Sequence, residues 1–246
     1  MAENDSKQLI NRLSELAQRA EKTGVPQASR FLNLAEQAEL MRLKSGVRFE
    51  LYGGYESAER RIAVFGDTEA EEYLPPLACI RIAPASQRFS DELTHRDFLG
   101  SLMALGVTRE MLGDIIVEGG SGYLMCLDSI AGFIIDNLSE VKRTTVKCSL
   151  SDLPDNINSE PEPVSAVIAS ERLDAMISAV YRVPREEAKQ LIEKGVVFVD
   201  SRLVQKPAAA LKEGALVTVR GRGRFKFLGI ERETKKGKLR VLVIKY

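Results

Sequence analysis

The stretch from residue 170 to residue 201 constrains the fold most, because it suits two short helices and a tight strand-turn-strand. The first helix is predicted from apolar residues at helical spacing between Leu173 and Val180, with Ser170 as its N-cap. The second is predicted to begin at Pro184, because the first helical position needs no N–H donor. Together these signals predict a compact helix pair.

Gly195 is typical of the end of that second helix, because glycine adopts the left-handed conformation at low cost. Val197 and Val199 then alternate as in a half-buried strand. Asp200 and Ser201 follow, and both residue types favour turns. The chain is therefore expected to reverse there into another strand.

Several cations of this helix pair and of the strands after it lie off the apolar stripes. If residues 220–226 are extended, four cations share one face of the strand, and Phe225 and Phe227 share the other. Neighbouring cations repel one another without an anion, so a phosphate backbone is the natural partner, and an ordinary solvated surface is the alternative. The candidate RNA-binding residues are Arg172, Arg182, Arg185, Lys189, Lys194, Arg202, Lys206, Arg220, Arg222, Arg224 and Lys226.

A family resemblance rests on the same stretch. The residues that carry it are Arg172-Leu173-Asp174, Arg185, Ala188, Leu191-Ile192, Gly195, Val197, Val199, Lys206-Pro207 and Glu213-Gly214. This pattern resembles the alpha-L RNA-binding module, which is named after a small-subunit ribosomal protein. Pro184 stands where a serine is usual, and Asp200-Ser201 replaces the usual Asn-Gly, yet both substitutes suit the local geometry. The resemblance implies that the cationic face binds structured RNA.

The charge distribution agrees with a basic module joined to an acidic body. The net charge of the chain is zero, but residues 164–246 hold 18 lysines and arginines against 9 acids, a net charge of +9. Residues 1–163 hold 17 against 26, a net charge of −9. Such asymmetry favours nucleic-acid binding by the basic part.

The N-terminal part predicts a helical hairpin followed by a β-hairpin. Within residues 5–44, one apolar face runs from Leu9 to Ala20, and a second runs from Phe31 to Met41. Residues 47–67 then predict a β-hairpin that contains Tyr52-Gly53-Gly54-Tyr55. This segment lacks the lysine and serine of a P-loop, so its glycines indicate a bulge or a close backbone approach.

Residues 77–150 predict the order β-α-β-β-α-β. The expected strands are 77–82, 114–117, 123–127 and 145–150, with helices that start at Thr94 and Ser129. This is the ferredoxin-like split unit, which RNA-recognition motifs share. Tyr123 is the only aromatic residue on the third strand, where those motifs stack bases. RNA binding by this domain is therefore possible, and a scaffold or protein-docking role is the alternative.

Residues 93–116 resemble the YlmH family of bacterial proteins, through Leu-Thr-His-Arg-Asp-Phe-Leu-Gly and Leu-Gly-Asp-Ile-Ile. Its members join an N-terminal region and an RNA-recognition-like middle to a C-terminal alpha-L module. The expected fold class is α+β. The expected parts are an N-terminal helical hairpin and β-hairpin (1–75), a ferredoxin-like, RNA-recognition-motif-like domain (76–150), a linker (151–163), and an alpha-L RNA-binding domain with a β extension (164–246).

Composition argues against several classes of protein. No apolar run approaches the roughly 18 residues of a membrane span, and no signal peptide is visible, so a cytoplasmic protein without a membrane partner is expected. Cys79, Cys126 and Cys148 lack paired spacing, so we expect buried free thiols and neither a disulfide nor a zinc site. His95 is the only histidine, and no glycine-rich cofactor fingerprint is present, so no cofactor, metal or catalytic site is expected.

The resemblance also implies a function. Similar family members associate with the large ribosomal subunit and peptidyl-tRNA, and are implicated in ribosome-associated quality control of stalled nascent chains. A monomeric, non-enzymatic protein that binds structured RNA (rRNA, tRNA) on that subunit is therefore expected. The alternatives are an RNA-modifying enzyme of the pseudouridine synthase type and a protein-interaction adaptor in cell division. Against the enzyme, Asp174 lies inside the binding module, where a structural role is expected.

Overall fold

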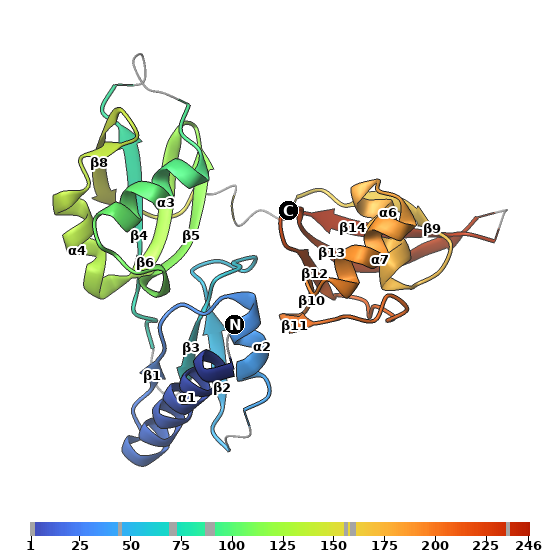
Figure 1. Cartoon of the computed structure of the whole chain (residues 1–246), viewed down its shortest axis with the longest axis horizontal. Helices are drawn as coiled ribbons and strands as arrows, with labels where there is room; N and C mark the ends of the chain where they lie inside the picture. The colour runs from blue at the N-terminus through green and yellow to red at the C-terminus, as the bar shows by residue number, and fades with distance from the viewer. Residues whose placement is uncertain are drawn as a thin grey trace. The chain divides into compact units, whose positions relative to one another are not determined.

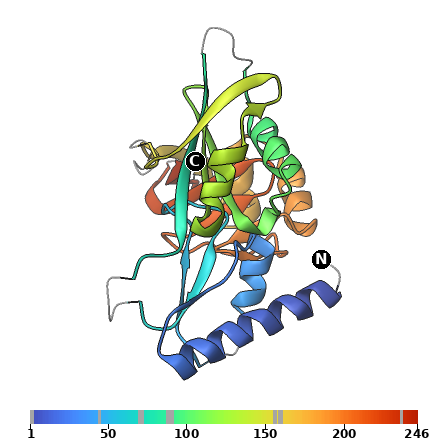
Figure 2. The same cartoon turned by 90° about the vertical axis from the view of Figure 1, so that its left-hand side faces the viewer.

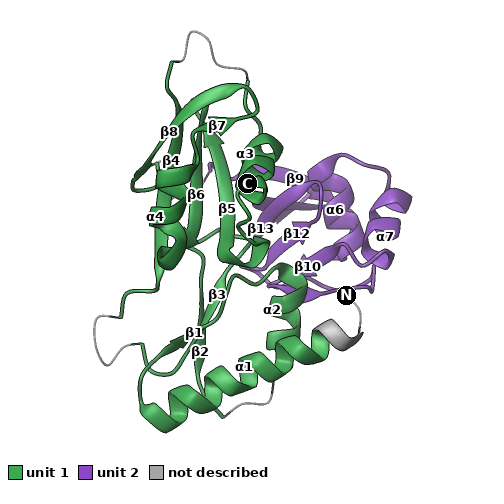
Figure 3. Ribbon diagram, turned by 60° about the vertical axis from the view of Figure 1, so that its left-hand side comes forward, with its two compact units in different colours: residues 1–158 green, residues 159–246 purple. Residues whose placement is uncertain are grey.

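The computed structural model describes residues 3–43, 46–68, 73–86, 92–154, 157, 161–234 and 237–246. They divide into two compact units, residues 1–158 and residues 159–246 (Figure 3). The expected linker, residues 151–163, lies partly outside the described residues. In the described ranges, none of the helices combines the length and the hydropathy that a bilayer span requires.

The first unit begins with a helix-covered three-stranded sheet, here called the N-terminal lobe (described residues 3–68). Its elements are α1 (Glu3–Thr23), β1 (Gln27–Ala28), α2 (Leu34–Leu40), β2 (Phe49–Tyr52) and β3 (Ile62–Phe65). The strand order is β1-β3-β2, and both pairs are antiparallel. Figure 2 shows the long helix α1 in dark blue. It packs Leu13, Ala17 and Ala20 against Ala63 and Phe65 of this sheet.

The β-hairpin of this lobe was expected, but the helical hairpin is only partly correct. Strand β1 lies between the two helices, and Phe31 lies before α2, where its side chain packs with Ile62. The helix begins after Asn33, whose side chain accepts bonds from the amides of Ala35 and Glu36 at 2.9 and 3.2 Å. Glu36 accepts a bond from the Asn33 amide at 2.7 Å in return. This capping box sets a later start than apolar spacing alone indicates.

The second half of this unit has the expected ferredoxin-like order (Figure 1). Its elements are β4 (Leu77–Pro84), α3 (His95–Ala104), the 3-10 turn η2 (Arg109–Met111), β5 (Leu112–Glu118), β6 (Ser121–Leu127), α4 (Asp128–Asn137), β7 (Glu140–Val141) and β8 (Thr144–Leu150). The antiparallel sheet has the order β5-β6-β4-β8-β7, in which the two-residue β7 was not expected. Thr94 and Asp97 form the predicted capping box of α3, with the Thr94 amide 2.8 Å from the Asp97 carboxylate.

The two faces of this sheet have different neighbours. Helices α3 and α4 cover one face, and Phe98 and Ile134 join its central core. The N-terminal lobe covers part of the other face, where Phe31 packs against Met125. The predicted close approach at the glycines of residues 53–54 is confirmed, because a Cβ on Gly54 would lie 2.3 Å from the end of Met125.

The second unit is a six-stranded antiparallel sheet with two helices. Its elements are β9 (Val164–Ile168), α6 (Leu173–Tyr181), α7 (Arg185–Glu193), β10 (Val197–Val199), β11 (Arg202–Leu203), β12 (Leu216–Val219), β13 (Gly223–Glu233) and β14 (Leu239–Lys245). The strand order is β11-β10-β12-β13-β14-β9. Met176 and Ile192 from the two helices share a buried core with Val217, Phe225 and Val243 from the sheet.

Most local signals in this unit are confirmed, and two helix starts need correction. Gly195 ends α7 with φ +71°, and Asp200 and Ser201 turn the chain with φ of +48° and +61°. However, the N-cap of α6 is Arg172 rather than Ser170. Pro184 is the N-cap of α7 rather than its first residue.

The expected straight row of four cations at residues 220–226 is wrong. Residues 220–222 form the turn between β12 and β13, and the Arg222 amide donates to the carbonyl of Val219 at 2.9 Å. Gly221, with φ +81°, lies in this turn. Strand β13 begins only at Gly223, so Arg224 and Lys226 alone share a strand face.

Candidate nucleic-acid interface

A buried carboxylate organises the start of α6. The Asp174 side chain is 0% exposed and accepts bidentate hydrogen bonds from two guanidinium groups. Arg172 donates to it at 3.0 and 3.0 Å, and Arg185 donates at 3.2 and 3.2 Å. A guanidinium has five N–H groups, so each arginine retains donors for another partner. The arginine side chains are 41% and 46% exposed, which leaves those donors accessible.

The loop before β12 explains why α6 begins where it does. The Leu173 amide donates to the carbonyl of Ala209 at 2.8 Å, and the Asp174 amide donates to that of Pro207 at 3.1 Å. These bonds satisfy donors of the first helical turn, so no capping side chain is needed. Because Lys206 directly precedes Pro207, the loop brings a further exposed cation to this end of the helix.

The charges around Asp174 hold it ionised. Burial raises the pKa of Asp174, but hydrogen bonds and charges from Arg172 and Arg185 outweigh burial, and the pKa lies below its usual value. One fixed anion thus orients two cations whose combined charge exceeds its own. The result is a pre-organised, net positive pair of planar donors, a geometry that suits phosphate oxygens.

The turn between β12 and β13 carries a second group of cations. Arg222 forms an ion pair with Glu187 of α7. The Arg220 guanidinium lies 5.1 Å from the ring centroid of Phe198 in a cation–π contact. Helix α7 therefore supplies Arg185 to the cluster around Asp174 and pairs Glu187 with Arg222 of the turn.

Tyr181, the last residue of α6, packs against the core of this unit and was not predicted. Its ring contacts Phe225 edge-on at 5.9 Å, and the Lys245 ammonium lies 5.2 Å from its centroid. Burial raises the pKa of Tyr181 to about 12, although the charges of Arg224 and Arg222 oppose that shift. Lys245 also escaped prediction. The alternation of residues in β14 was the signal in the sequence for its position. Strand pairing places this lysine opposite Phe225.

The remaining predicted cations are spread over the unit. Lys189 forms an ion pair with Glu186 at 3.1 Å. Arg182 and Lys194 are the exposed C-caps of α6 and α7, and Arg202 is exposed on β11. The structure therefore joins Arg172 with Arg185 through Asp174 and links the β12–β13 turn to α7 through Arg222 and Glu187, whereas Arg182, Lys194 and Arg202 lie at the ends of α6, α7 and β11.

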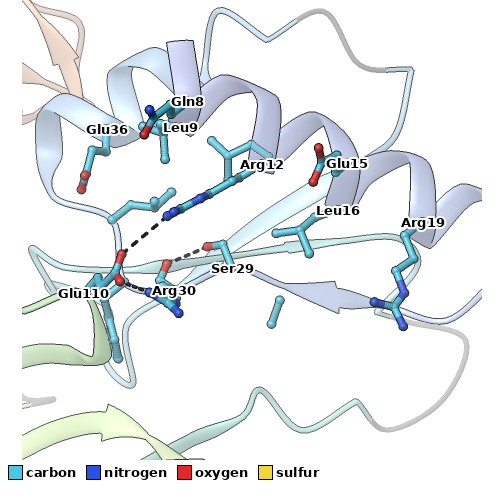
Figure 4. Close-up of a pocket in the computed structure, with 14 residues that line it drawn as sticks. Gln8, Leu9, Arg12, Glu15, Leu16, Arg19, Ser29, Arg30, Glu36 and Glu110 are labelled. Atoms are coloured by element: carbon cyan, nitrogen blue, oxygen red, sulfur yellow. Dashed lines mark hydrogen bonds and ion pairs between the residues drawn. The ribbon is translucent and has the colours of Figure 1, made fainter. Parts of the chain in front are cut away.

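The first unit contains an open groove of about 680 Å³ along α1 (Figure 4). Leu9, Leu13 and Leu16 supply apolar walls, and Arg12 and Arg30 converge on Glu110 at the rim. Acids and bases are equal in number among its lining residues. This groove lacks the excess positive charge that RNA phosphates favour.

The three cysteines are free thiols, and burial disfavours their thiolate forms. Burial raises the pKa of Cys79, Cys126 and Cys148 to about 11, 12 and 11, and all three are free. Thiols with raised pKa values are poor nucleophiles at neutral pH. His95 is exposed as the first residue of α3. In the part of the chain that the structure describes, no cluster of three or more His, Cys, Asp or Glu side chains suits a metal ion.

The fold, together with the arginine cluster around Asp174, is that of a protein with RNA-binding domains of two kinds. Residues 77–155 match the family described as "Putative RNA-binding domain in YlmH", and residues 171–217 match the S4 domain, the alpha-L module.

A curated relative identifies the family more closely. The chain is 31% identical over 219 residues to "Ribosome-associated protein quality control protein P2" of Bacillus subtilis (strain 168), covering 86% of this chain and 84% of the relative. The chain belongs to the YlmH family. A solved structure, "Cell division protein ylmH from Streptococcus pneumoniae", is 18% identical with a TM-score of 0.47, over 60% of this chain and 91% of that chain.

Proposed function

We propose that this protein is a non-enzymatic RNA-binding factor that acts on the large ribosomal subunit. In this proposal it binds rRNA or peptidyl-tRNA there and takes part in the quality control of stalled nascent chains. The name of the Bacillus relative supports the process, and the two RNA-binding domains support the type of ligand. We further propose that the protein acts as a monomer in the cytoplasm, without a cofactor.

The observation that carries the proposal is the Arg172–Asp174–Arg185 cluster. Two half-exposed guanidinium groups are fixed by one buried carboxylate in a segment with a net charge of +9 over residues 164–246. Fixed planar donors lose little conformational entropy when they bind a phosphate. We expect this cluster to fix the position of the RNA, while the other cations of the unit add salt-dependent affinity.

The test should change cations that do not support the fold. Arg185 is unsuitable for charge reversal, because a glutamate there would face Asp174. Lys194 and Lys206 are exposed, and the side-chain amide of Gln205, next to Lys206, donates to the carbonyl of Glu193, next to Lys194, at 3.4 Å. The double variant Lys194→Glu with Lys206→Glu therefore removes one cation next to the loop that contacts the start of α6 and one at the far end of α7, and neither residue contacts Asp174.

A matched control is available at the other end of β13. Arg232→Glu with Lys238→Glu makes the same change in net charge on exposed residues. Arg232 lies eight residues along the strand from Arg224, roughly 26 Å away at the usual rise of a strand.

The experiment is sucrose-gradient sedimentation of the tagged protein in cell extract at low and moderate salt. We expect the wild type and the control to migrate with large subunits, and the Lys194/Lys206 variant to shift to the top of the gradient. Equal migration of both variants would rule out this surface. Migration of the wild type at the top of the gradient at both salt concentrations would contradict the ribosomal role.

A further inference from the structure

The sheet of the ferredoxin-like domain has one face that is partly covered by the N-terminal lobe. Helices α3 and α4 pack on the other face. On the partly covered face, Cys79, Met125 and Leu127 pack against the N-terminal lobe, in one cluster with Phe31 and Ile62. An extended RNA strand therefore has no path across the whole face.

Strand pairing sets a row of side chains across this face. Strand pairing aligns Ile116 with Tyr123, Tyr123 with Arg81, and Arg81 with Ser149. The four residues lie across β5, β6, β4 and β8, on the side of the sheet that bears Met125, because alternate residues of a strand share a face. Arg81 and Ser149 of this row are exposed, and Ile116 and Tyr123 are half-buried, so the row lies beside the part of the face that packs against the N-terminal lobe.

The row and its neighbours on this face combine an aromatic ring with charged side chains. Tyr123 is half-buried, and its neighbour Arg81 is exposed with no ion-pair partner among the described residues. Lys147 adds an exposed cation on the neighbouring strand, opposite Ala83. Glu118, at the end of β5, adds an acid to this face.

We propose that this row binds one or two unpaired RNA bases, with Tyr123 stacked on a base and Arg81 bound to the adjacent phosphate. An aromatic ring beside a cation suits a nucleobase and its phosphate better than a peptide, because both parts of the nucleotide are matched. The inference rests on the proposed RNA-binding function and adds a second contact, separate from the arginine cluster of α6. The lobe-covered part of the sheet restricts the site to a short unpaired segment.

The absence of tryptophan from the chain allows a direct test. Tyr123→Trp in the full-length protein introduces a single indole fluorophore into the proposed site. A matched control is Phe133→Trp, because Phe133 is 49% exposed on α4, on the helix-covered side of the sheet. Each variant is titrated with a short single-stranded oligoadenylate and with a fully paired RNA hairpin.

We expect the single strand to quench the indole fluorescence of the Tyr123→Trp variant, and we expect the hairpin to leave it unchanged. The fluorescence of the Phe133→Trp control should respond to neither RNA. No quenching in the Tyr123→Trp variant, or equal quenching of both variants, would overturn the proposal.

Affinity measurements separate this inference from the proposed function. Binding of the labelled oligoadenylate by anisotropy should weaken roughly tenfold in Arg81→Ala, and it should not change in Arg96→Ala, an exposed arginine on α3. If Arg81→Ala binds the oligoadenylate like the wild type, while the hairpin still binds in a salt-dependent way, the inference about this face is wrong and a protein partner becomes its better interpretation. The proposed function would then still stand. If the wild type binds neither RNA, the proposed function fails as well.

Discussion

At the scale of single residues, Asp174 has the largest influence on the candidate interface. Its carboxylate is fully buried, while the arginines it binds are half-exposed. Removing the anion would leave two cations close together, although water can still solvate both. The role of Asp174 is therefore to orient Arg172 and Arg185, which agrees with the structural role expected from the sequence.

We predict that Asp174→Asn lowers the free energy of unfolding of the second unit by about 2 kcal/mol, because a neutral amide replaces the charge-assisted acceptor. Urea denaturation followed by circular dichroism would measure this. The control is Glu186→Gln, which breaks an exposed pair with Lys189 and should change stability by less than about 0.5 kcal/mol. A loss as small as that of the control would contradict the orienting role.

The contribution of Asp174 should also depend on pH. Its folded-state pKa lies below its unfolded value of about 3.9, so the unfolded state binds the proton more readily. The stabilisation is complete above that unfolded value and is lost as the pH falls through the folded pKa. We predict that the stability difference between wild type and Asp174→Asn shrinks as the pH is lowered from about 6 to about 3. A difference independent of pH would show that packing, not charge, accounts for the effect.

At the scale of elements, the packing of the N-terminal lobe on the ferredoxin-like sheet depends on glycine. A Cβ on Gly113 of β5 would lie 2.7 Å from the Phe31 ring and 2.9 Å from the Met125 Cβ. The Met125 Cβ is fixed by its own strand, so it cannot move aside. The same contact covers part of the sheet face and lies beside the proposed base-binding row.

We predict that Gly113→Ala destabilises the first unit by about 1–3 kcal/mol, as overpacking of a core does. Gly132→Ala in α4 is the matched control, because nothing lies within 4 Å of its added Cβ. This control should stabilise the protein by about 1 kcal/mol, the usual difference between alanine and glycine in a helix. Thermal unfolding of both variants would check the prediction, and equal effects would disprove the close packing.

At the scale of the whole molecule, the two units have separate cores. Residues 159–246 form a six-stranded sheet and two helices around a core that includes Phe225, Phe227 and Ile192. We predict that this fragment alone folds cooperatively and binds an RNA hairpin with the same salt dependence as the full chain. Circular dichroism and anisotropy would measure the two properties. A fragment that is unfolded, or folded without affinity for RNA, would contradict the prediction.

The sequence by itself determined the elements with short-range signals. The capping box of Thr94 and Asp97, the stop at Gly195 and the turn at residues 200–201 depend on neighbours within a few residues. The ferredoxin-like order also followed from local periodicity. The two-residue strands β1 and β7 escaped prediction, because so short a strand has no period of its own and exists only through its partner.

Only the tertiary structure decided how the cations are used. The pairing of Arg185 with Asp174 requires α6 and α7 to meet, and the start of α6 depends on carbonyls of residues 207 and 209. The turn at residues 220–222 interrupts the alternation of cations that the spacing of residues 220–226 predicted. The reason is that the pairing of β12 with β13 begins at Val219 and Gly223. Charge and periodicity reveal that cations are present, but which cation meets which acid depends on contacts between residues far apart in the chain.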